Sequence, residues 1–127
     1  MKIRILLCLP FLLAACVTTG TAAQTRPEGV ARIGQTVRVG GPTVRPIAVI
    51  EDSRCPSDVT CVWSGRLVVR VEVGTGRGKR RMDLTLGTPV HVADGALTLR
   101  EALPGKLQGR KLSPRSYRFM FTFSGGL

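Results

Sequence analysis

The pattern of apolar and polar positions along this chain predicts β-strands over most of its length. In residues 66–73 apolar and polar positions alternate, which places four side chains on one face: Leu67, Val69, Val71 and Val73. Alternation with a period of two is typical of a strand with one buried face. A second alternating run, residues 81–86, follows a glycine-rich segment at 74–78. The two runs predict a β-hairpin whose inward residues are Met82, Leu84 and Leu86.

Aromatic side chains mark the last predicted strand, residues 117–123. They occupy every second position and therefore share one face: Tyr117, Phe119, Phe121 and Phe123. Because aromatic rings bury large apolar areas, we expect these four to form much of the core.

Three weaker runs predict strands at 35–39, 44–51 and 96–102. Pro46 cannot donate a ladder hydrogen bond, which indicates a sheet edge or a bulge at its position. Residues 98–103 also fit a single helical turn, since six residues are too few for periodicity to decide. The segment 104–116 is basic and punctuated by Pro and Gly, and it predicts a long loop.

These runs together predict one all-β domain over residues 30–127. Its six to seven short strands are typical of a small antiparallel sandwich or barrel, here with one disulfide-stapled loop. No helix of the length usual in globular domains is predicted, and the sequence contains no internal repeat.

The first residues predict export. Lys2 and Arg4 precede a short apolar stretch that ends at Cys16, too short to cross a bilayer and typical of a signal peptide over residues 1–15. The sequence Leu-Ala-Ala-Cys at 13–16 resembles the lipobox of bacterial lipoproteins, which implies a mature chain that begins at S-lipidated Cys16. Ordinary cleavage after the Thr-Ala-Ala sequence at 21–23 is the alternative.

Residues 16–29 are small and polar and predict a flexible tether between the lipid and the domain. Two or three acyl chains at Cys16 would hold the protein stably on a membrane. Val17 follows the lipidated position. Since aspartate there is the usual inner-membrane retention signal of bacterial lipoproteins, its absence favours the periplasmic face of the outer membrane in a cell with two membranes.

Charge narrows the choice of partners. Removal of residues 1–15 takes away two positive charges and no negative ones, which lowers the net charge from +11 to +9. Such a domain attracts anionic partners in the envelope, although basic residues spread along the whole chain also fit a plain compositional bias. Nucleic acid is disfavoured, because an exported protein rarely meets it and only six aromatic residues are present to stack on bases.

The segment 52–65 carries two cysteines and the single tryptophan of the chain. In an oxidising compartment Cys55 and Cys61 should form a disulfide, since Cys16 is acylated and Cys8 leaves with the signal peptide. We expect Trp63 to cover this disulfide and Gly65 to allow a tight bend or bulge. The simplest interpretation of the segment is a stapled corner of the fold.

Three functional interpretations compete with the stapled corner. A redox site is disfavoured, because the usual motif is C-x-x-C at a helix N-terminus. A metal site would need reduced Cys55 and Cys61 together with His91, which supplies only three ligands. A recognition loop remains, in which Arg54, Asp58 and Trp63 present a preordered surface to a protein or glycan partner. We expect the domain to bind a protein or an anionic envelope component through this loop or through the basic segment 104–116.

The sequence offers no catalytic set, so we expect a protein that is not an enzyme and needs no metal or cofactor. His91 is the only histidine, and it lies beside a turn. Glu51 and Asp52 are adjacent carboxylates, but neighbouring side chains of a strand point to opposite faces.

The residues of the motif D-S-R-C-P-x4-C-x-W-x-G, at 52–65, resemble those of a group of uncharacterised bacterial secreted proteins and lipoproteins. The resemblance covers about fifteen residues and implies an exported, disulfide-bonded β domain without a known activity. The sequence therefore predicts a cell-envelope lipoprotein that acts as a binding or structural module. An inhibitor-like domain, whose clamped loop enters the cleft of a protease or another hydrolase, is the alternative.

Overall fold

The computed structural model describes residues 29–125, and the regular structure of this part consists of strands and one short 3-10 helix. The strands are β1 (Val30–Ala31), β2 (Val37–Arg38), β3 (Thr43–Asp52), β4 (Leu67–Thr75), β5 (Gly78–Thr85), β6 (Val90–Val92), β7 (Gly95–Leu103) and β8 (Arg118–Gly125), and the 3-10 helix is η1 (Pro114–Ser116). The all-β class predicted from the sequence is confirmed. The predicted signal peptide, the predicted lipidation site Cys16 and nearly all of the predicted tether lie outside the described residues.

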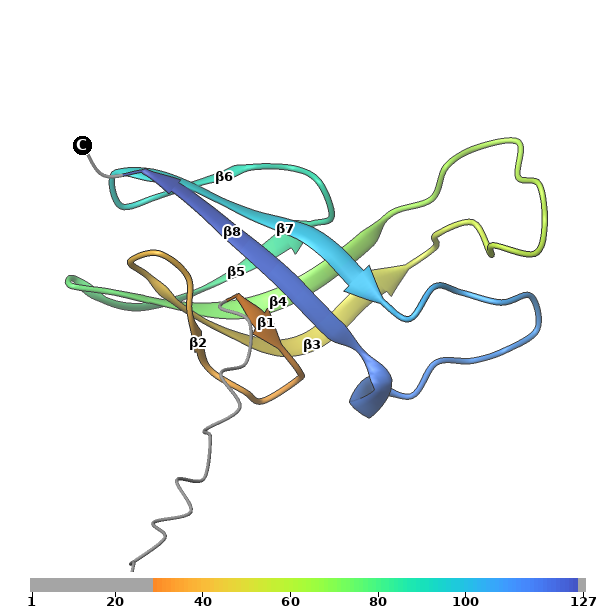
Figure 1. Ribbon diagram of the computed structural model, residues 1–127, viewed down its shortest axis with the longest axis horizontal. Helices are drawn as coiled ribbons and strands as arrows, with labels where there is room; N and C mark the ends of the chain where they lie inside the picture. Colours follow the sequence, from red (N-terminus) through yellow and green to blue (C-terminus); the bar gives the residue numbers. More distant parts are fainter. Residues whose placement is uncertain (1–28, 126–127) are drawn as a thin grey trace, which may run out of the picture.

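The strands form two antiparallel sheets of four strands each, which face one another as a sandwich (Figure 1). One sheet has the order β2-β3-β4-β5 and the other has the order β1-β8-β7-β6. The predicted hairpin is confirmed, because β4 pairs with β5 from Val68 opposite Thr85 to Thr75 opposite Gly78. The structure has two strands more than the six runs read from the sequence, β1 and β6, and both are only two or three residues long.

The core lies between the two sheets and is built from the alternating faces that the sequence pattern predicts. The inward residues of β4 are fully buried, and on the other sheet Phe119 and Phe121 of β8 pack against them. Tyr117 is also buried, whereas Phe123 is only partly buried at the far end of its strand. Burial of one such side chain contributes about 1.5–3 kcal/mol, so these two strands hold the sheets together.

The strand β3 contains the predicted irregularity. Its register with β4 shifts between Pro46 and Ala48 and again between Val49 and Glu51. The neighbouring strand β2 pairs with β3 only at Thr43 and Val44, so Pro46 needs no ladder hydrogen bond on that side. The possible helical turn at 98–103 is a strand instead, because this run is paired with β8 inside the sheet.

Two long loops leave the same end of the sandwich (Figure 1). The first, residues 53–66, joins β3 to β4 and contains both cysteines; we call it the clamped loop. The second joins β7 to β8 and contains residues 104–116, which we call the basic loop. At the opposite end the chain makes short turns between β4 and β5 and between β6 and β7.

Candidate functional site

The clamped loop is closed at its base by its own backbone. The amide of Ser53 donates to the carbonyl oxygen of Arg66 at 2.9 Å, and the amide of Arg66 donates to Oγ of Ser53 at 3.0 Å. Outside this pair, Arg66 Nε donates to a carboxylate oxygen of Glu51 at 2.7 Å. The two strands therefore continue as a narrow neck before the loop opens.

Gly65 is required by this neck. A Cβ atom at position 65 would collide with the backbone carbonyl group of Ser53. Only glycine lets two backbones approach so closely. The sequence predicted a tight bend or bulge at Gly65, and the structure instead shows a close approach of the Ser53 backbone at this position.

Beyond the neck, Cys55 and Cys61 form the predicted disulfide, with their Cα atoms 5.9 Å apart. The bond closes a ring of seven residues in which Pro56 limits the backbone further. A ring of this size removes about 2 kcal/mol of chain entropy from the unfolded state. The cysteines are thus bonded to each other, and His91 lies on β6 in the other sheet.

Arg54 fastens the clamped loop to the opposite sheet. Its guanidinium donates two hydrogen bonds to the carboxylate of Asp52, at 2.8 and 2.9 Å. It also donates to the carbonyl oxygens of Ala102 at 3.0 Å and Pro104 at 3.2 Å. The side chains of Arg54 and Asp52 are only 15% and 9% exposed, so the sequence-based expectation of an exposed arginine is wrong.

Tyr117 completes this cluster, since its hydroxyl donates to Asp52 at 2.7 Å. Burial by itself would raise the pKa of Asp52, but the hydrogen bonds from Arg54 and Tyr117 outweigh it and hold the pKa below its usual value. Burial and the bond to Asp52 raise the pKa of Tyr117 to about 12. The hydrogen bond to Asp52 also raises the pKa of Arg54. At neutral pH the cluster is therefore an ion pair with a neutral phenol.

The basic loop lies against the clamped loop through further hydrogen bonds. The amide of Ser57 donates to the carbonyl oxygen of Lys106 at 2.9 Å, and the amide of Gln108 donates to Asp58 at the same distance. In return, Lys106 Nζ donates to the backbone oxygen of Asp52 at 2.7 Å. Asp58 is exposed, but one of its carboxylate oxygens is occupied by this contact between the loops.

The tip of the clamped loop contrasts with this bonded base. Residues 60–64 are all exposed, and the two apolar residues among them are the most prominent: Val62 is 95% exposed and Trp63 is 75% exposed. Trp63 does not cover the disulfide, contrary to expectation, since Trp63 is largely exposed and Cys61 is exposed as well. We call Val62 and Trp63 the apolar tip.

The three predicted recognition residues thus have different structural environments. Trp63 lies free on the surface, Asp58 bridges the two loops, and Arg54 is locked inside the ion pair. Sequence reasoning overlooked Val62, although its position between Cys61 and Trp63 placed it on the loop. It also overlooked the contact of Tyr117 with Asp52, for which the chain carries no local signal.

The adjacent carboxylates Glu51 and Asp52 have separate partners. Glu51 and Asp52 do not share a cleft, because Glu51 binds Arg66 and Asp52 binds Arg54 and Tyr117. Within residues 29–125, no three His, Cys, Asp or Glu side chains gather as metal ligands would. The same part of the chain contains no long apolar helix of the kind that spans a bilayer. Compared with known protein families, with curated proteins and with solved structures, the chain gives no significant match.

Proposed function

We propose that this chain is a cell-envelope lipoprotein whose β domain is a non-enzymatic binding module, and that the apolar tip is its contact point. The observation that carries the proposal is the contrast within one loop. The polar anchors at its base are bonded to the scaffold, while Val62 and Trp63 are 95% and 75% exposed to solvent. Exposed apolar groups of this kind mark interaction sites.

A rigid loop lowers the cost of binding. The disulfide, the neck at Gly65 and the ion pair of Arg54 fix the loop before any partner arrives, so little conformational entropy is lost on association. Tryptophan is the side chain most enriched among residues that dominate interface energies. Burial of Trp63 in a partner would contribute about 2–4 kcal/mol.

The basic loop leaves the same end of the sandwich as the clamped loop and gives the partner a second property. Arg110, Lys111 and Arg115 are exposed on this loop, which is held to the clamped loop by Ser57 and Asp58. The surface that fits is an apolar pocket bordered by negative charge. We infer a protein of the cell envelope, because a pocket that accepts one indole ring requires a folded surface.

The membrane anchor and the location at the outer membrane are parts of the same proposal. They are supported by the signal peptide, the lipobox at 13–16 and Val17 in the sequence. With a tether of about a dozen residues after Cys16, the domain would search the space close to the membrane for its partner.

An inhibitor-like domain is the second candidate, and the exposure of the tip favours it. A clamped loop that projects Val62 and Trp63 is able to enter a hydrolase cleft without refolding. The two candidates differ in the partner: inhibition requires a hydrolase whose activity falls when the domain binds.

The proposal is tested by affinity capture from the envelope of the organism that encodes the chain. The full chain, with a tag at its carboxyl end, is expressed as wild type, Trp63→Ala, Val62→Ser and Met120→Ala. Met120 is an exposed apolar residue on β8, outside both loops, and is the matched control. We expect one partner to be retained by wild type and Met120→Ala and to be lost from both tip variants.

Retention of that partner by Trp63→Ala contradicts the proposal. Binding of the wild type to protein-free vesicles of anionic phospholipid, lost in Trp63→Ala, would replace the protein partner by a membrane surface. If the captured partner is a hydrolase, its activity in the presence of the purified chain separates inhibition from simple binding. Arg54→Ala is unsuitable here, because it breaks the scaffold as well as the surface.

A further inference from the structure

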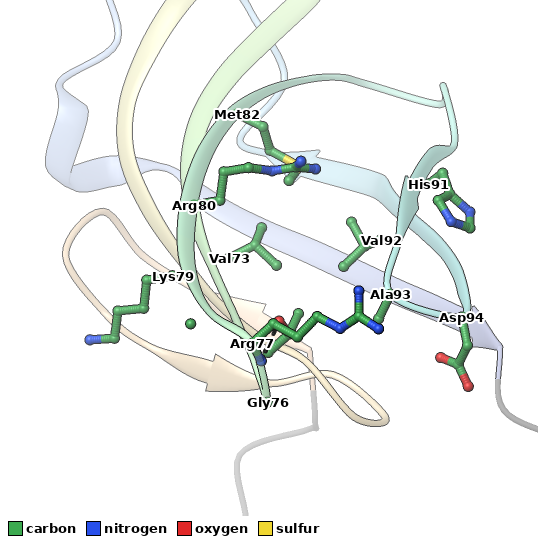
Figure 2. Close-up of a pocket in the computed structure, with 12 residues that line it drawn as sticks. Val73, Gly76, Arg77, Lys79, Arg80, Met82, His91, Val92, Ala93 and Asp94 are labelled. Carbon is green, nitrogen blue, oxygen red and sulfur yellow. Dashed lines mark hydrogen bonds between the residues drawn. The ribbon is translucent and has the colours of Figure 1, made fainter.

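A pocket of about 810 Å³ lies at the end of the sandwich opposite the clamped loop (Figure 2). It opens beside β5 and β6, which are the outermost strands of the two sheets on that side. Its size falls within the range of about 300–1,000 Å³ that is usual for small-molecule sites. The pocket shares no residue with the clamped loop or the basic loop.

The inner wall of this pocket is apolar. Val73 of β4 and Val92 of β6 are almost fully buried, and Figure 2 shows their side chains pointing toward each other across the space. Met82 of β5 adds a partly buried thioether. An apolar wall of this kind is suited to a hydrocarbon chain.

Arg80 is exposed, but its position on β5 puts it on the same face of the strand as Met82 and Leu84. It pairs directly with Val73, just as Met82 pairs with Val71, and directly opposed residues of an antiparallel pair share one face. In Figure 2 its side chain extends beside Met82, whereas Lys79 points away from the pocket. A guanidinium is thus placed over the apolar wall.

A second guanidinium comes from the turn between β4 and β5. Figure 2 shows Arg77 extending from this turn toward Ala93, on the turn between β6 and β7. Within residues 29–125 neither Arg77 nor Arg80 has a carboxylate partner within 4.0 Å, in contrast to Arg54, Arg66 and Arg70. Asp94 is the one carboxylate among the lining residues, so the pocket carries a net positive charge.

An inward charge on an edge strand also discourages edge-to-edge pairing of sheets. That role would account for Arg80 alone. It requires neither a second guanidinium from the neighbouring turn nor an open apolar volume between the strands.

We propose that this pocket binds a single-chain anionic amphiphile. Its phosphate or carboxylate head would accept hydrogen bonds from Arg77 and Arg80, whose planar guanidinium groups suit such oxygens. Its hydrocarbon chain would lie against Val73, Met82 and Val92. Inorganic phosphate alone would leave the exposed part of Met82 in water, and a neutral chain would leave both guanidinium groups without partners. The proposal is independent of the apolar tip.

The methionine methyl groups provide the test. The full chain is labelled with ¹³C at its methionine methyl groups and titrated with decyl phosphate below the concentration at which it forms micelles. Met82 lines the pocket, while Met120 on the outer face of β8 serves as an internal control. We expect the Met82 signal to shift saturably and the Met120 signal to stay in place. Decyltrimethylammonium and inorganic phosphate should each produce no saturable shift.

The charge requirement is tested with Arg77→Gln/Arg80→Gln, which should weaken binding of decyl phosphate about tenfold or more. Arg118, the first residue of β8, lies outside the pocket and provides the control. Arg118→Gln removes the same kind of charge, and this variant should bind decyl phosphate within about twofold of wild type. If the double variant does not fold, Arg77→Gln in the exposed turn gives the same comparison. In the titration, the proposal is overturned if the Met82 signal does not shift, if the Met82 and Met120 signals shift together, or if inorganic phosphate shifts Met82 as decyl phosphate does. It is also overturned if the arginine variants bind decyl phosphate as tightly as wild type.

Discussion

Gly65 occupies the narrowest point of the clamped loop, and Trp63, only two residues earlier, lies in open solvent. The close approach of the Ser53 backbone accounts for the glycine at position 65, whereas no contact within the scaffold accounts for the tryptophan at position 63. Among the motif residues at 52–65, Asp52, Ser53, Arg54, Cys55, Cys61 and Gly65 each have a partner or a close approach within the scaffold. Trp63 is the motif residue whose side chain has no such role in the scaffold.

Gly65→Ala tests the scaffold. The added methyl group would collide with the backbone of Ser53, so the neck must open and the free energy of unfolding should fall by about 2 kcal/mol or more. Gly76→Ala is the matched control, since a Cβ atom there meets nothing within 4 Å. Urea unfolding followed by circular dichroism compares the two, and an equal, small effect would contradict the neck as described.

Asp52→Ala tests the ion pair. At pH 7 it should cost about 2–3 kcal/mol, because Arg54 and Tyr117 lose a charged partner. The native pKa of Asp52 lies below its unfolded value, so the ionised carboxylate stabilises the fold above pH of about 4. This contribution is lost as pH falls through the native pKa. The difference between wild type and variant should therefore shrink in acid, and a constant difference down to pH 2 would argue against the ion pair.

The environment of Arg54 was beyond sequence reasoning for a physical reason. Its carbonyl partners at Ala102 and Pro104 lie 48 and 50 positions away, and Tyr117 lies 65 positions from Asp52. Alternation reveals which face of a strand is buried, but not which distant loop meets it. The position of Arg80, in contrast, was predictable, because the alternation that puts Met82 and Leu84 on the core-facing side of β5 puts Arg80 on the same side, where it remains exposed.

At the scale of elements, the strands were largely predictable because one sheet face is apolar and the other polar. The buried runs of β4 and β8 follow that alternation closely, and Pro46 correctly indicated the bulge in β3. The strands β1 and β6 were not predicted, because a run of two or three residues is too short to show an alternation of apolar and polar positions. The expected cover of the disulfide by Trp63 was wrong because no sheet face extends to the tip.

Cys55→Ser/Cys61→Ser tests the clamp as an element. The variant should lose about 2 kcal/mol of stability, the chain entropy of a seven-residue ring. Hydrogen exchange followed by mass spectrometry should rise at residues 56–62 and stay unchanged in β4 and β8, because Arg54 and the neck still hold the base. Faster exchange throughout the core would mean that the disulfide supports the whole domain.

At the scale of the whole molecule, the sandwich separates two surfaces. One end carries the apolar tip and the basic loop, and the other carries the pocket with Arg77 and Arg80 (Figure 1, Figure 2). The short turns leave the second end compact, whereas the long loops project from the first. A partner protein and a small amphiphile would therefore occupy the domain together without contact.

Cys16→Ala tests the proposed anchor of the whole molecule. In the cell that encodes the chain, the variant should leave the membrane fraction, since no acyl chain would hold it. The wild type should stay with membranes washed in high salt, which screens attachment by charge but does not release acyl chains. A variant that remains in washed membranes would contradict a lipid anchor at this residue.

Photo-crosslinking in the living cell tests whether the apolar tip is the point of contact with a partner. A photoreactive p-benzoylphenylalanine replaces Trp63 in one strain and Met120, the exposed control on β8, in another. We expect a discrete crosslinked species with position 63 and none with position 120. No adduct at position 63, or the same adducts at both positions, would contradict this expectation.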